Sequence, residues 1–134
     1  MIRYKVVSKE RERYYSSQKC RMDTDLEFMT VEYIPGEWVD EPIPRSGLFV
    51  FRELEDALTC RGNSDEVWEV EVGGDAYPEL SWVLNLDSNR TTEESVREFW
   101  ASPFTEDSQR YSYWPIPRGT ERYPRVRLVR KVPC

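Results

Sequence analysis

Two carboxylates at alternate positions, Glu69 and Glu71, are the residues of this chain whose types and spacing best fit a reaction. They lie in a segment with the apolar alternation of a β-strand, so both side chains are expected on one face, about 7 Å apart. Such a pair can orient a ribose and stabilise positive charge that develops at its anomeric carbon. Pairs of this kind are also common on solvated or ion-paired strand faces, and the sequence favours this structural interpretation.

Arg3, in the expected first strand, completes a pattern that resembles the ADP-ribosyltransferase superfamily. The arginine-specific branch of that superfamily uses a first-strand arginine, a Ser-Thr-Ser stretch and a Glu-x-Glu pair. The resemblance implies an enzyme that uses a nicotinamide nucleotide, with Arg3, Glu69 and Glu71 as its catalytic residues. The chain departs from the pattern because no Ser-Thr-Ser follows a strand between Arg3 and Glu69, and Ser16 and Ser17 are a poor substitute.

Arginines and aromatic residues form a second candidate site. Some of these arginines lie in the acidic middle of the chain, and others flank an aromatic cluster in a loop expected at residues 102–120. The residues are Arg52, Arg61 and Arg90 in the middle, and Arg110, Tyr111, Tyr113, Trp114 and Arg118 in the loop. Such side chains can clamp a phosphate and stack a ring, form a protein-interface hot spot, or pack in the core. Core packing is the simplest alternative, and among ligands a protein partner is favoured over a small nucleotide.

The absence of histidine excludes several classes of site. Metal sites with imidazole ligands and Ser-His or Cys-His catalysis are not available to this chain. Its three cysteines, Cys20, Cys60 and Cys134, are odd in number and far apart, so neither a disulfide framework nor a metal site is expected. The chain also has no phosphate-binding glycine loop, and we expect no cofactor.

Charge is unevenly distributed along the chain, whose formal net charge is −6. Residues 1–24 and 95–134 carry an excess of lysine and arginine, whereas residues 25–94 are strongly acidic. We interpret this pattern as terminal strands that flank acidic ones, so that opposite charges meet across a sheet. The acidic middle opposes nucleic-acid binding, which is therefore not expected, although acidic mimicry of a nucleic acid stays open.

The 134 residues fit one α+β domain spanning 1–134, since single cores are commonly about 100 to 150 residues in size. At its centre, residues 47–72 predict an apolar strand at 48–51, a short helix at 53–61 and a strand at 66–72. Other strands are expected at 2–7, 25–34, 80–86 and 123–132, with an extended piece at 37–39 and a loop or weak hairpin strand within 8–20. A capping box predicts a second helix at 92–101. The sum is a mainly antiparallel sheet of about six or seven strands with two short helices.

The membrane is not an expected partner. No apolar stretch approaches the roughly 20 residues that cross a bilayer. The first residues also show no apolar signal region. A cytoplasmic protein is therefore predicted.

The succession of strand patterns YKVV, VEYIPGEWV, GLFVFRELEDAL, EVWEVEV and RVRLVRKV resembles small uncharacterised proteins encoded by phages, prophages and prokaryotic genomes. The resemblance covers most of the chain and implies a genome context and interference with a host system, but no activity. We therefore expect a non-enzymatic binding protein that acts on a host protein or a nucleotide signal, with an ADP-ribosyltransferase-like enzyme as the alternative. The sequence leaves the partner and the oligomeric state open.

Overall fold

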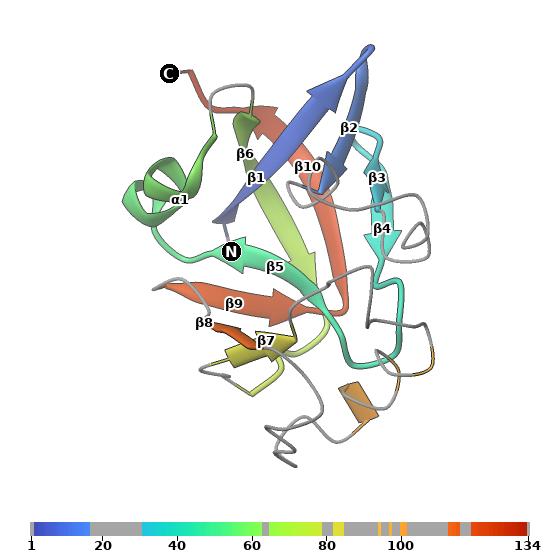
Figure 1. Cartoon of the computed structure of the whole chain (residues 1–134). Coiled ribbons are helices and arrows are strands. Elements are labelled where there is room, and N and C mark those ends of the chain that lie inside the picture. The colour runs from blue at the N-terminus through green and yellow to red at the C-terminus, as the bar shows by residue number, and fades with distance from the viewer. Residues whose placement is uncertain are drawn as a thin grey trace.

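A computed structural model of the chain describes residues 2–16, 31–62, 65–78, 82–84, 94, 97, 100–101, 113–115 and 119–133. The strands are β1 (Ile2–Glu10), β2 (Arg13–Ser16), β3 (Glu32–Tyr33), β4 (Trp38–Asp40), β5 (Leu48–Phe51), β6 (Asp65–Gly73), β7 (Trp82–Leu84), β8 (Tyr113–Pro115), β9 (Thr120–Tyr123) and β10 (Arg125–Lys131). Helix α1 (Leu54–Cys60) connects β5 to β6 along the chain (Figure 1). The antiparallel sheet and the helix are consistent with the predicted α+β class.

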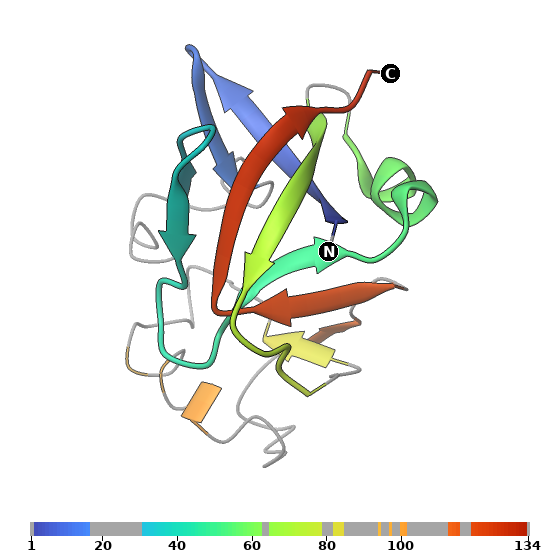
Figure 2. The same cartoon turned by 180° about the vertical axis from the view of Figure 1, so that it is seen from behind.

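The main sheet is curled, and its two ends are neighbours in the chain. Within the described part of the chain it has eight strands, and its main path runs β3-β2-β1-β6-β10-β4. The end strands β3 and β4 are joined by a tight turn, where the Gly36 amide donates to the Leu128 carbonyl of β10 at 2.9 Å. Gly36 has a φ of +87°, which glycine adopts without strain. The turn therefore carries the chain from the β2 side of the sheet to the β10 side, as Figure 2 shows from behind.

Strands β5 and β9 extend the sheet at one end. β5 pairs with β1 through Tyr4 and Phe51 and with all four residues of β9. Figure 1 shows β5 and β9 running across the lower ends of β6 and β10. A separate two-stranded sheet is formed by β7 and β8.

Buried apolar side chains lie on both faces of the central strands. The inner cluster fills the concave side of the curled sheet and comprises Val7, Val31, Tyr33, Leu48, Val50, Trp68, Val70, Tyr123, Val126 and Leu128. The outer cluster lies under α1 and comprises Val6, Phe51, Ala57, Val67 and Val132. Adjacent residues such as Val6 and Val7 belong to different clusters because successive side chains of a strand point to opposite faces.

Several predicted elements are confirmed. The strand–helix–strand unit at 47–72 is present as β5, α1 and β6. Its helix forms because Leu54 and Ala57 pack on the sheet, while Glu55 and Asp56 occupy the first turn, where negative charge is favourable. Of the two alternatives for 8–20, a loop or a weak hairpin strand, the strand is present as β2, while β1 extends to Glu10 and residues 17–20 lie outside the described part of the chain. Most of the strand predicted at 25–34 lies outside the described residues, which contain only its end, β3.

The numbers of helices and strands differ from the prediction. The described residues contain one helix with defined bounds rather than two, and residues 94, 97, 100 and 101 of the expected second helix are helical while the rest lies outside them. The loop expected at 102–120 contains β8 and the first residue of β9. Prolines in 102–120 favoured a loop, but Pro115 ends a short strand, a position that a residue without an amide donor tolerates.

Candidate functional site

Glu69 and Glu71 lie on the convex, outer face of β6 and pair with arginines of β10. Arg130 donates to Glu69 at 2.8 Å, and Arg127 makes a close ion pair with Glu71. Residues 127 and 130 stand opposite Glu71 and Glu69 in the register of the two strands. The structural interpretation of the two carboxylates as an ion-paired strand face is therefore confirmed, as is the expectation that basic and acidic strands meet.

Arg3 points to the other side of the sheet. It stands opposite Val70 on the neighbouring strand β6, and directly opposed residues share a face. Val70 is fully buried in the inner cluster, so Arg3 lies on the concave face while Glu69 and Glu71 lie on the convex one. The structure does not bring together the residues implied by the ADP-ribosyltransferase resemblance.

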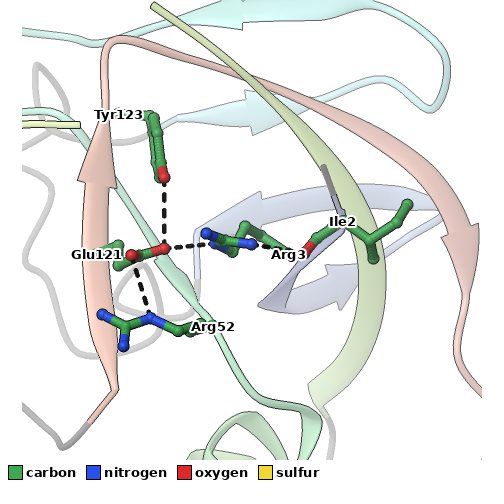
Figure 3. A network of polar contacts seen from close by, with 5 residues as sticks. All are labelled: Ile2, Arg3, Arg52, Glu121 and Tyr123. Atoms are coloured by element: carbon green, nitrogen blue, oxygen red, sulfur yellow. Dashed lines mark hydrogen bonds and ion pairs between the residues drawn. The ribbon is translucent and has the colours of Figure 1, made fainter. Parts of the chain in front are cut away.

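Glu121 of β9 joins Arg3 to Arg52, as Figure 3 shows. One carboxylate oxygen accepts from Arg3 Nε at 2.5 Å and from the Tyr123 hydroxyl at 3.4 Å, and the other accepts from Arg52 Nε at 3.3 Å. Arg3 also donates to the Ile2 carbonyl at 3.0 Å. These contacts connect β1, β9 and the β5–α1 connection. The cluster therefore stabilises the position of β5 and β9 relative to the rest of the sheet.

The charge state of Glu121 follows from this arrangement. Burial by itself raises the pKa of the Glu121 carboxyl, but the hydrogen bond and the charge of Arg3, with a smaller contribution from Arg52, hold its pKa below the ordinary value. The ionised form is therefore the one that the folded chain stabilises. Sequence reasoning selected both arginines but missed Glu121, because nothing in the local sequence indicates which strand end will face residue 3.

The remaining predicted binding residues are not joined in one described site. Arg61 is exposed and directly follows α1. Tyr113 and Trp114 lie in β8, opposite residues 84 and 83 of β7. Arg90, Arg110, Tyr111 and Arg118 lie outside the described residues.

A Trp-centred surface on the convex face was not predicted. We use the name Trp38 surface for Ile34, Trp38, Asp40, Glu69, Glu71, Arg125, Arg127, Val129 and Arg130. The guanidinium carbons of Arg125 and Arg127 lie 5.1 and 4.8 Å from the centroid of the Trp38 ring. Trp38 nevertheless stays 37% exposed. The indole is thus held in place by two cations while part of it faces solvent.

Backbone features of the neighbouring strands shape this surface. Gly73 of β6 lies beneath the indole, and a Cβ there would stand 3.3 Å from the ring of Trp38. The β10–β6 register shifts between Leu128 and Arg130, so Val129 is an extra residue that turns outward and is 46% exposed. Ile34, which precedes the Gly36 turn beside Leu128, is 51% exposed. Ile34 and Val129 therefore expose apolar side chains where the Gly36 turn meets β10.

Each arginine of the Trp38 surface has an acidic partner. Arg125 pairs with Asp40 at 2.8 Å across β10 and β4. The pairs of Arg127 with Glu71 and of Arg130 with Glu69 cross from β10 to β6. Positive and negative charges are consequently balanced within this surface, although the whole chain has a net charge of −6.

Arg122 is a buried arginine whose contacts join several segments of the chain. Its guanidinium donates to the carbonyls of residues 45, 46 and 78 at 2.8 to 3.1 Å. It also lies over the rings of Tyr77 and Trp100, at 5.1 and 4.8 Å. Burial lowers the pKa of Arg122, although the charge remains. The contacts fix the chain segments around β9.

A lysine and a tyrosine lie inside the curled sheet. The Lys5 ammonium donates to the Phe49 carbonyl at 2.6 Å and lies 5.1 Å from the centroid of the Tyr33 ring. Burial lowers the pKa of Lys5 to about 7. The Tyr33 hydroxyl is buried without a hydrogen-bond partner among the described residues, and burial raises its pKa. Both side chains belong to the core rather than to an accessible site.

Two further observations bear on the kind of site. Among the residues that the structure describes, no group of His, Cys, Asp and Glu side chains is arranged to hold a metal ion. No helix in the same part of the chain is long and apolar enough to span a bilayer. Comparisons of the chain with protein-family models, with curated proteins and with solved structures found no match.

Proposed function

We propose that the protein is a non-enzymatic binding protein and that the Trp38 surface contacts another protein. The observation that carries the proposal is the partly exposed indole of Trp38, over which the guanidinium groups of Arg125 and Arg127 lie. Tryptophan and arginine dominate the energetics of protein interfaces. A ring already held by two cations loses little further freedom when a partner covers it.

A protein partner fits this surface better than a small nucleotide does. A phosphate is negatively charged, and each arginine of this surface, Arg125, Arg127 and Arg130, lies against a carboxylate that would repel it. A protein face with exposed apolar side chains and charges of both signs matches the mixed character of the Trp38 surface.

The ADP-ribosyltransferase-like alternative receives less support from the geometry. Arg3 lies on the face of the sheet opposite to Glu69 and Glu71, and the two carboxylates are held by arginines. Release of nicotinamide from NAD by the wild-type chain, lost in a folded Glu71→Gln variant, would favour the enzyme. If neither the wild type nor the variant releases nicotinamide, the result favours a binding protein.

A cytoplasmic setting and an origin in a phage or mobile element are part of the same proposal. The exposed, unpaired thiol of Cys60 is consistent with a reducing compartment. The resemblance of the strand patterns to phage and prophage proteins supports the genome context.

Site-specific photo-cross-linking tests the proposed surface. A benzophenone amino acid replaces Val129 within the surface, and the matched control replaces Leu58 of α1, which is 38% exposed compared with 46% for Val129. We expect a cross-linked protein product from position 129 that disappears when Trp38→Ala is added, and none from position 58. Equal products from both positions, or no product from position 129, would contradict the proposal.

A further inference from the structure

We infer that the partner seated on the Trp38 surface is a second copy of this chain. This inference rests on the function proposed above and adds the identity of the occupant. Most soluble oligomers are symmetric assemblies of identical chains, and a two-fold interface brings the same patch of both subunits together. Such a patch must be complementary to itself in charge and must carry apolar side chains at its centre.

The charges of the Trp38 surface meet the first requirement. Arginines line β10, and acidic residues flank them on both sides, Asp40 on β4 and Glu69 and Glu71 on β6. A copy turned about a two-fold axis that runs along the boundary between β4 and β10 places its β10 against β4 of the first copy, so that Arg125 of each copy faces Asp40 of the other. The side chains of Asp40 and Arg130 are 76% and 72% exposed, so both can take part in a contact between chains.

Charge also distinguishes this surface from other parts of the molecule. Two chains with a net charge of −6 repel one another when they approach through acidic regions such as the start of α1, where Glu53 and Glu55 are exposed. The Trp38 surface carries its own counter-charges and avoids that repulsion at short range. Like-charge repulsion thus favours the balanced face over the acidic ones.

The apolar side chains meet the second requirement. The exposed large apolar residues among the described ones are Ile2, Ile34, Trp38, Leu58 and Val129. Of these, Ile34, Trp38 and Val129 gather where β4, the Gly36 turn and the irregular part of β10 meet. Covering this group in a two-fold contact buries the indole of each copy near the centre of the interface, where hot spots are usually found.

Sedimentation equilibrium of the purified chain over a range of concentrations tests the inference. We expect a reversible monomer–dimer equilibrium for the wild type. Val129→Asp should raise the dimer dissociation constant by about tenfold or more, as is usual for loss of a hot-spot contact. Leu58→Asp adds the same charge at a similarly exposed position on α1. This variant should change the dimer dissociation constant by less than about twofold, the effect expected from one additional negative charge on the chain.

Other results would overturn the inference. A wild type that is monomeric at every concentration contradicts it, as do equal effects of Val129→Asp and Leu58→Asp. Arg130→Glu, at a side chain that is 72% exposed, provides a second variant that should also weaken the dimer if Val129→Asp fails to fold. If the wild type is monomeric but cross-links from position 129 to a different protein, a second copy is excluded as the partner. The proposed function would then still be supported.

Discussion

The guanidinium carbon of Arg127 lies 4.8 Å from the centroid of the Trp38 ring, directly across the β10–β4 pairing. The same guanidinium pairs with Glu71 on the other side of β10. Arg127 thus connects a half-exposed indole on β4 to a carboxylate on β6. This arrangement places Glu71, a catalytic candidate in the sequence, in an ion pair within the proposed binding surface.

The lowered pKa of Lys5 should appear in the pH dependence of the free energy of unfolding. Burial lowers its pKa from 10.5 to about 7 in the folded chain. Between these values the unfolded chain binds the proton and the folded chain does not, so this group makes stability rise with pH by up to about 1.4 kcal/mol per unit. Below pH 7 both states are protonated and the slope from this group vanishes.

Urea unfolding of the wild type and Lys5→Met at pH 7, 8 and 9 measures this slope. Lys5→Met should be the more stable protein at pH 7, and the difference in free energy of unfolding should shrink as the pH rises. Parallel pH curves for the two proteins would show that Lys5 titrates in the folded state as it does in water.

Tyr33→Phe should leave stability unchanged or increase it. The Tyr33 hydroxyl is buried and has no partner among the described residues, and an unsatisfied buried hydroxyl costs about 1–3 kcal/mol. The matched control is Tyr123→Phe, which removes a hydroxyl that donates to Glu121 and should lose about 0.5–1.5 kcal/mol. Chemical denaturation compares the two. A larger loss from Tyr33→Phe than from Tyr123→Phe would mean that the Tyr33 hydroxyl is hydrogen-bonded.

Glu12→Gly should stabilise the β1–β2 hairpin. Arg11 and Glu12 form its two-residue turn with φ values of 49° and 70°, a conformation that favours asparagine and glycine. Removing the side chain at residue 12 relieves a left-handed strain of about 1–2 kcal/mol, whereas the greater freedom of glycine in the unfolded chain costs about 0.5–1 kcal/mol, so we expect a net gain of about 1 kcal/mol or less. The control is Gly36→Ala, which places a side chain at a φ of +87° and should destabilise. Thermal unfolding would contradict this account if Glu12→Gly lowered the melting temperature.

Glu121→Gln should destabilise the fold more than Glu71→Gln does. Glu121 accepts hydrogen bonds from Arg3 and Arg52 with its side chain only 14% exposed, and a hydrogen bond to a charged group is worth about 1.5–3 kcal/mol. The Glu71 side chain is 41% exposed, and an exposed ion pair contributes about 0–1 kcal/mol. Urea unfolding at pH 7 should separate the two variants, and equal losses would contradict the structural role of Glu121.

Acid pH provides an independent check on Glu121. Because the folded pKa of this carboxyl lies below its ordinary value of 4.5, it stabilises the fold above that value and loses its contribution as pH falls through the folded pKa. The wild type and Glu121→Gln should therefore converge in stability at low pH. A constant difference between pH 7 and pH 3 would contradict this linkage.

Local patterns were enough to predict the centre of the fold. The apolar run at 48–51, the helical spacing from Leu54 to Leu58 and the alternation through β6 each reflect an element with a strong period of its own. The pairing of Glu69 and Glu71 with a basic terminal strand also followed from charge distribution. These features depend on short segments, and a single sequence contains the information for them.

Long-range relationships could not be predicted in the same way. Glu121 meets Arg3 across 118 positions of sequence, and Trp38 meets Arg127 through a pairing of β4 with the last strand. Which strands become neighbours, and in which register, depends on packing of the whole domain rather than on any local pattern. The Trp38 surface was therefore missed even though a strand was predicted at 123–132 within the basic end of the chain.

A dilution series of amide NMR spectra of the purified chain shows whether a second copy docks on the Trp38 surface. Docking should produce concentration-dependent shifts for β4 (Trp38–Asp40) and β10 (Arg125–Lys131), while the signals of α1 (Leu54–Cys60) keep their positions. Spectra that do not change with concentration, or changes centred on α1, would contradict it.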